Sequence, residues 1–122
     1  MLALWLSIVG SLWAEPNCLH FNYSYDNYVS CPAINPTNFT VEAWVRPGAL
    51  YMEQRIISTL NDGDYTGMEL RIESDCYPSV IIGNGSNFII VKGSTRLKIA
   101  EWVHYAATYN GTNLNLYIKV VS

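Results

Sequence analysis

The sequence predicts an all-β protein in which two antiparallel sheets pack face to face. From residue 19 onward, apolar and polar residues alternate with a period of two, and almost no stretch has a helical period. About eight short runs of this kind follow one another at regular spacing. Glycine and asparagine separate the runs, as in the turns of β-sandwiches.

The expected strands are justified in chain order by alternation and by the residues that end them. A first hairpin is expected, with arms at residues 18–21 and 28–31. The run 39–46 alternates strictly and stops at Pro47-Gly48, and Asn110-Gly111 between two alternating runs is typical of a tight hairpin turn. The later expected strands are residues 39–46, 55–59, 68–73, 80–82, 88–92, 103–109 and 114–118.

The amino terminus indicates secretion. Eleven of the first 14 residues are apolar, none is charged, and the run stops at Glu15-Pro16. A transmembrane helix needs about 20 apolar residues, so this run is too short for a membrane span. We interpret residues 1–14 as a signal peptide cleaved after Ala14, which leaves one domain over residues 15–122. The alternative is a hydrophobic first strand that stays in the domain.

The composition excludes two classes of protein. Charged residues make up 14% and aromatic residues 13% of the 122 residues, whereas disordered chains are rich in charge and poor in aromatics. The net charge is −3, and no basic stripe is present that could neutralise phosphates. We therefore expect a folded domain that does not bind nucleic acid.

Sequons and cysteines fit an extracellular protein. Four N-x-[ST] sequons make Asn22, Asn38, Asn84 and Asn110 glycosylation candidates. The three cysteines permit one bridge. If the first hairpin forms, it places Cys18 opposite Cys31 at about 4.5–5.5 Å between Cα atoms, within reach of a disulfide. Buried free thiols are the alternative.

Four blocks of the sequence resemble the laminin-G-like modules of the concanavalin A-like lectin/glucanase superfamily. In chain order they read DNYV at 26–29, FTVEAWVRP at 39–47, WVHYAATYNG at 102–111 and LYI at 116–118. The resemblance implies a secreted jelly-roll sandwich that binds glycans or proteins. Some relatives bind calcium and others are glycoside hydrolases. Family members usually continue after the last block with a turn and further strands, so the chain is expected to be incomplete at its carboxyl end.

No catalytic residue is assigned. Glu69 and Glu73 lie about 13 Å apart along a strand, too far for a glycosidase pair, and with Asp75 and Arg71 they are interpreted as a solvated strand face. The Glu-x-Asp-x-x-Glu arrangement of the family's glucanases is absent. Neither histidine adjoins a serine or cysteine that it could activate.

Two groups of residues are candidates for binding. Asp62 and Asp64 are the only metal candidates, for calcium, although a plain hairpin loop uses the same residue types. No cofactor is assigned beyond this calcium. Tyr23, Tyr25, Asp26 and Asn27 form a candidate ligand loop, because aromatic rings and carboxylate or amide groups suit sugars and protein interfaces. Packing of these rings is the alternative. The tryptophans Trp44 and Trp102 are expected to pack in the core or between the sheets.

These observations predict a secreted, non-catalytic recognition module whose partner is an extracellular glycan or protein. One alternative is a remnant glycoside hydrolase of the same superfamily. Another is a structural fragment that pairs with a second chain through an open sheet edge.

Overall fold

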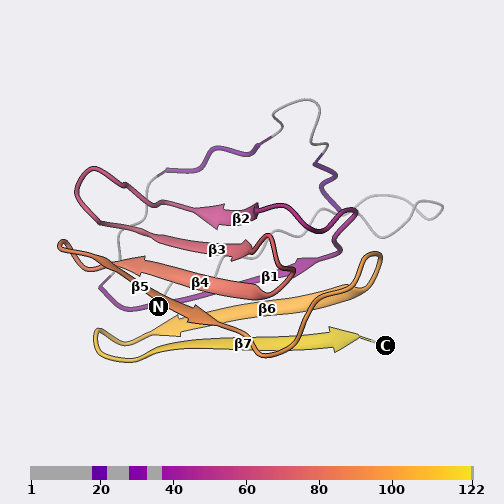
Figure 1. Ribbon diagram of the computed structural model, residues 1–122. Coiled ribbons are helices and arrows are strands. Elements are labelled where there is room, and N and C mark those ends of the chain that lie inside the picture. Colours follow the sequence, from indigo (N-terminus) through magenta and orange to yellow (C-terminus); the bar gives the residue numbers. More distant parts are fainter. Residues whose placement is uncertain (1–17, 22–27, 33–36, 122) are drawn as a thin grey trace.

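The computed structural model describes residues 18–21, 28–32 and 37–121, and these contain seven β-strands in two antiparallel sheets (Figure 1). Within the described ranges there is no helix that could cross a membrane. The strands are β1 (Phe39–Val45), β2 (Gln54–Ser58), β3 (Met68–Ile72), β4 (Pro78–Gly83), β5 (Phe88–Lys92), β6 (Trp102–Tyr109) and β7 (Leu114–Val121).

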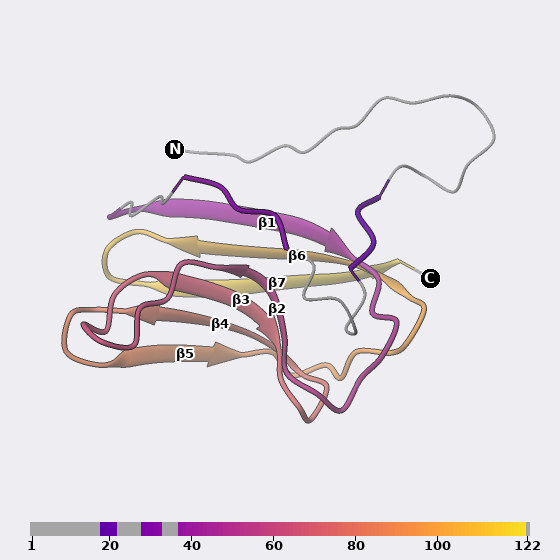
Figure 2. The same ribbon diagram turned by 90° about the horizontal axis from the view of Figure 1, so that it is seen from above.

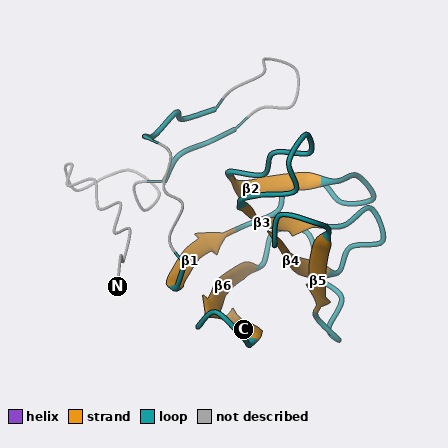
Figure 3. Ribbon diagram, turned by 90° about the vertical axis from the view of Figure 1, so that its left-hand side faces the viewer, coloured by secondary structure: helices purple, strands orange, loops and turns teal. Residues whose placement is uncertain are grey.

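The two sheets form two stacked layers (Figures 2 and 3). One sheet has the strand order β1-β6-β7 and the other the order β2-β3-β4-β5. Hairpins join β2 through β5 in succession, and another hairpin joins β6 to β7. The chain therefore crosses between the layers twice, after β1 and after β5.

The core lies between the layers because alternation gives each strand one apolar face. On β6, the side chains of Val103, Tyr105 and Ala107 are fully buried, whereas their neighbours along the strand face outward. β3 and β4 supply the facing surface. The buried core cluster consists of Met68, Leu70, Ile72, Val80, Ile82, Leu97, Val103, Tyr105 and Ala107.

Two glycines permit close backbone contacts, Gly67 within the β2–β3 loop and Gly83 between that loop and the β4–β5 turn. A Cβ atom on Gly67 would lie 2.0 Å from the carbonyl oxygen of Thr59, and one on Gly83 would lie 2.1 Å from that of Tyr65. Gly67 also has a φ of 86°, which L-residues rarely adopt. Backbone hydrogen bonds link the two connections, including one of 2.8 Å from the amide of Gly85 to Tyr65.

Tyr105 links the two sheets through a buried hydrogen bond. Its hydroxyl donates to the main-chain carbonyl of Arg71 on β3 at 2.5 Å. Burial raises the pKa of Tyr105 above its ordinary value of 10.0, and the charge of Glu73 raises it further. The folded state thus favours the neutral, protonated hydroxyl of Tyr105. Its contribution to stability is present below pH 10 and is lost as the pH rises through the raised pKa.

The structure confirms the all-β, two-sheet fold and the expected strands from residue 39 onward. The last strand differs, because β7 extends to Val121 rather than ending at residue 118. The expected first hairpin is wrong for its described arms, since residues 18–21 and 28–31 form no strand. Trp44 is also not in the core: it is 55% exposed, because it alternates with Ala43 and Val45 and so points out of the sandwich.

Replacing Tyr105 by phenylalanine tests the link between the sheets. Tyr105→Phe leaves the carbonyl of Arg71 without this donor, so the free energy of unfolding falls by about 1–2 kcal/mol. It also removes the loss of stability above pH 10. Urea denaturation at neutral and alkaline pH measures both effects. Tyr117→Phe is the control, because Tyr117 is 54% exposed. Equal effects of the two substitutions would contradict the role of Tyr105.

Candidate functional site

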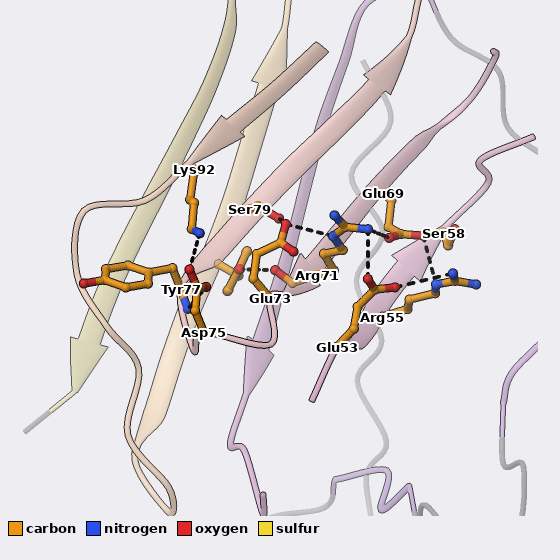
Figure 4. Close-up of polar contacts among 11 residues, drawn as sticks. Glu53, Arg55, Ser58, Glu69, Arg71, Glu73, Asp75, Tyr77, Ser79 and Lys92 are labelled. Atoms are coloured by element: carbon orange, nitrogen blue, oxygen red, sulfur yellow. Dashed lines mark hydrogen bonds and ion pairs between the residues drawn. The ribbon is translucent and has the colours of Figure 1, made fainter. Parts of the chain in front are cut away.

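Charged side chains line the outer surface of the four-stranded sheet (Figure 4). Because Met68, Leu70 and Ile72 face the core, the intervening residues Glu69 and Arg71 point to the opposite side of β3. Figure 4 shows neighbouring elements bringing further polar groups beside them. We call this surface the polar face; it consists of Glu53, Arg55, Ser58, Glu69, Arg71, Glu73 and Ser79.

Glu69 is a buried carboxylate in the middle of the polar face. Its side chain is 1% exposed. Ser58 donates a hydrogen bond of 2.6 Å to Oε2, and Nε of Arg55 lies 3.4 Å from the same oxygen. The other oxygen, Oε1, is buried and accepts no hydrogen bond, while Nη1 of Arg71 forms an ion-pair contact with it at 3.5 Å. A buried charge is costly unless cations compensate it, and here two arginines do so.

Arg71 is the centre of this ion-pair network. Its Nε donates to Glu73 at 2.9 Å, and its Nη1 lies 3.2 Å from Glu53. Partial burial alone would lower the pKa of Arg71, but the hydrogen bond and charge of Glu73, with the charges of Glu53 and Glu69, outweigh it and raise the pKa. Ser79 donates a further hydrogen bond of 2.5 Å to Glu73. The network therefore fixes its charges in place.

A depression of about 270 Å³ opens on the polar face. Its margin includes Arg55, whose side chain is 66% exposed, and Glu53, which is 41% exposed. Ile90 on β5 is 55% exposed and adds an apolar wall. The depression is lined by Glu53, Arg55, Ser58, Leu60, Asp62, Glu69, Arg71, Ile81, Phe88 and Ile90. Charged groups of both signs thus lie next to apolar surface, an arrangement that suits polar ligands with an apolar side.

A second charged cluster lies where β3 connects to β4. Lys92 forms an ion pair with Asp75 (Figure 4). The ammonium group of Lys92 also lies 5.3 Å from the ring centroid of Tyr77, and the guanidinium of Arg96 lies 5.7 Å from it. The hydrogen bond from Lys92 lowers the pKa of Asp75 below its ordinary value of 3.8, and the amide of Tyr77 assists.

The acidic cluster is not the solvated strand face that the sequence predicts. Glu69 is buried, and Arg71 is only 19% exposed. The reason is tertiary, because Glu53 and Arg55 from β2 and the loop before it cover this part of β3. Glu69 and Glu73 each have a contact with Arg71, which holds their charges as ion pairs. The two carboxyl groups thus share one guanidinium partner.

The two metal candidates lie in the β2–β3 loop. Asp64 uses Oδ1 to accept hydrogen bonds from the amide of Thr66 at 3.1 Å and from its hydroxyl at 2.5 Å. Asp62 is exposed and lines the depression. Among the described residues, no three or more His, Cys, Asp or Glu side chains gather where they could hold a metal ion. Calcium binding at these residues stays a prediction.

Several other expected site residues lie outside the described ranges. These are Asn22, the ligand loop with Tyr23, Tyr25, Asp26 and Asn27, and the signal peptide over residues 1–14. Cys18 and Cys31 are described, and both are exposed and not bonded to each other. The bond between them stays a prediction.

The outer surface of the other sheet is aromatic. The rings of Trp44 and His104 lie 4.9 Å apart, and the ring of His104 forms a contact of 3.1 Å with Glu42. The ring of His104 is thus held by contacts with two side chains of β1. Tyr117 is exposed on the neighbouring strand β7. The sequence signal for this surface is present, since Trp44 alternates with apolar residues of β1.

Sequence reasoning did not single out Glu53, Arg55 or Ile90. No local pattern marks Glu53, because it lies in the loop before β2 and reaches Arg71 only through folding. Alternation in β5 does indicate the position of Ile90: Val91 packs on the core, so Ile90 lies on the outer face of the sheet.

Substitution of the two arginines tests the burial of Glu69. Arg71→Met leaves a buried carboxylate with less compensation, so the free energy of unfolding falls by about 3 kcal/mol. Arg55→Met costs less than about 1 kcal/mol, because Arg55 is mostly exposed. The double variant Glu69→Gln/Arg71→Met recovers part of the loss. Chemical denaturation measures all three. Equal losses for Arg71→Met and Arg55→Met would show that the burial of Glu69 does not depend on Arg71.

Titration of Asp75 tests the second cluster. Its pKa lies below 3.8 in the native chain, so its ion pair stabilises the fold above that pH and is lost as the pH falls through the lowered pKa. Lys92→Met returns the pKa towards 3.8. Lys98→Met is the control, since Lys98 pairs with Glu101 instead. Carboxyl carbon chemical shifts follow the titration. An unchanged pKa in Lys92→Met would contradict the assigned cause.

Comparison with known proteins places this arrangement in a family. A laminin-G-type family model, described as the concanavalin A-like lectin/glucanases superfamily, matches residues 23–119. No curated protein and no solved structure matches the chain at a significant level. The match covers most of the chain and agrees with the two antiparallel sheets. The protein therefore belongs to the laminin-G-like branch of the concanavalin A-like lectin/glucanase superfamily.

Proposed function

We propose that the protein is a secreted, non-catalytic recognition module that binds an extracellular glycan or protein through the polar face. Membership of a superfamily of lectin-like domains supports a binding role. The uncharged, apolar first 14 residues and the four sequons support secretion. The observation that carries the proposal is the depression, in which paired charges lie beside apolar side chains.

The polar face is suited to binding because its groups are already held in place. Arg71 keeps its contacts with three carboxylates, so little side-chain entropy is lost when a ligand arrives. Arg55 is the most available group, since its side chain is 66% exposed. It offers donors to hydroxyl or carbonyl oxygens, while Glu53 offers an acceptor. Ile90 supplies an apolar contact for the ligand.

The pairing of two carboxylates with Arg71 supports a non-catalytic role. A glycosidase needs one carboxyl group that donates a proton and a second that acts as a base or nucleophile. On the polar face Glu69 and Glu73 both contact Arg71. The side chain of Glu69 is 1% exposed and that of Glu73 is 17% exposed, so little of either carboxyl group is accessible to a substrate.

A glycan and protein-ligand screen of the purified full chain tests the proposal. Arg55→Gln and Ile90→Ala each weaken binding of the selected ligand by about tenfold or more, corresponding to about 1.4 kcal/mol. Lys119→Ala is the matched control, because Lys119 is an exposed cation on the other sheet. A ligand that binds both polar-face variants as tightly as the native chain would refute the site. Release of reducing sugar from β-glucans would refute the non-catalytic role.

A further inference from the structure

Three of the four sequons lie at the same end of the sandwich. Asn84 begins the β4–β5 turn and Asn110 begins the β6–β7 turn. Asn38 precedes β1, and the register pairs Phe39 with Tyr109, so Asn38 lies beside the β6–β7 turn. Figures 1 and 2 agree that both turns, the β2–β3 loop and the start of β1 lie at one end, on the left in each view. We call this the sequon end.

The three asparagines are accessible for modification. Each is exposed in the folded chain, as are Ser86 and Thr112, which complete two of the sequons. N-linked glycans are bulky and need surface positions. The sequence alone shows four sequons scattered over 91 positions from Asn22 to Thr112, and only the topology brings three of them together.

The side-chain geometry leaves free the atom to which a glycan attaches. Oδ1 of Asn84 accepts hydrogen bonds from the amides of Ser86 and Asn87, at 3.0 and 2.9 Å. Oδ1 of Asn110 does the same for Thr112 and Asn113, at 3.0 and 2.7 Å. Both turns thus use the oxygen. Within the described ranges, Nδ2 of neither asparagine donates a hydrogen bond, so a sugar on Nδ2 leaves the turn bonds intact.

The opposite end of the sandwich differs in its chemistry. Its loops contain no sequon, and they are tied together by hydrogen bonds. Arg46 donates to the carbonyl of Ala100 at 3.1 Å, and Arg96 donates to that of Asp75 at 3.1 Å. Among the described residues, then, three sequons gather at one end, and loops joined by arginine hydrogen bonds lie at the other.

We propose that N-linked glycans on Asn38, Asn84 and Asn110 together cover the sequon end and shield the β2–β3 loop. The amide of Gly85, next to Asn84, bonds to Tyr65 in that loop, so the sugar on Asn84 stands beside it. The glycans confine partner contacts to the faces and the opposite end. This inference rests on the proposed function in one respect, since the chain must enter a eukaryotic secretory pathway.

Secretion of the full chain from cultured eukaryotic cells tests occupancy. An Asn22→Gln background limits the count to the three sites. Partial enzymatic removal of N-glycans should then lower the apparent mass of the secreted chain in three steps. Asn38→Gln, Ser86→Ala and Thr112→Ala should each remove one step, and the last two keep the asparagine oxygen that holds the turn. A secreted chain in which any of the three asparagines stays unmodified overturns the proposal.

An added secretion leader separates this proposal from the proposed function. Three glycans on the chain only when the added leader precedes it would refute the signal peptide and uphold the glycan-covered end. Export by the chain's own amino terminus without the three glycans would uphold the signal peptide and refute the glycan-covered end.

Cleavage by an Asp-specific protease tests shielding. Asp62 and Asp64 lie in the β2–β3 loop. Asp75 is the matched control, because it lies in the β3–β4 connection, which is at the opposite end of the sandwich (Figure 1). Ser86→Ala should increase cleavage at Asp62 and Asp64 several-fold in the secreted protein and leave Asp75 unchanged. The same substitution in bacterially produced protein, which has no glycan, should change none of the three rates. Equal rates in the secreted native chain and Ser86→Ala would overturn the shielding.

Discussion

The fold depends on an apolar layer that β3, β4 and β6 bury between the two sheets. Alternate side chains of these strands enter the layer, so the side chains that enter the core dictate which residues point to the opposite face. Tyr105 adds a polar contact across this layer, from its hydroxyl to the carbonyl of Arg71. Because this hydrogen bond holds the backbone of Arg71, a core residue helps to position the arginine at the centre of the polar face.

The polar face follows from how β3 is placed between β2 and β4. As a central strand, β3 has neighbours that cover its outward side chains, so Glu69 is buried although it points away from the core. Its burial requires cations, which Arg55 and Arg71 supply. A mixed-charge surface beside Ile90 results, in which the carboxylates are held by arginine contacts.

The two ends of the sandwich differ in the hydrogen bonds that hold their turns and loops. The sequon end has turns held by the side-chain oxygens of Asn84 and Asn110, whose nitrogen atoms donate no hydrogen bond to any described residue. The opposite end has loops joined by arginine hydrogen bonds, with Asp75 and Lys92 near them. The polar face extends between the ends.

The sequence by itself determined the strands from residue 39 onward, because alternation is local and turns at Pro47-Gly48 and Asn110-Gly111 are chemically specific. It also determined the family, through blocks that follow those strands. Only the tertiary structure decided that Glu69 is buried, that Trp44 is exposed and that three sequons share one end. The physical reason is that burial and proximity depend on which strands become neighbours, and strand pairing joins residues far apart in the chain.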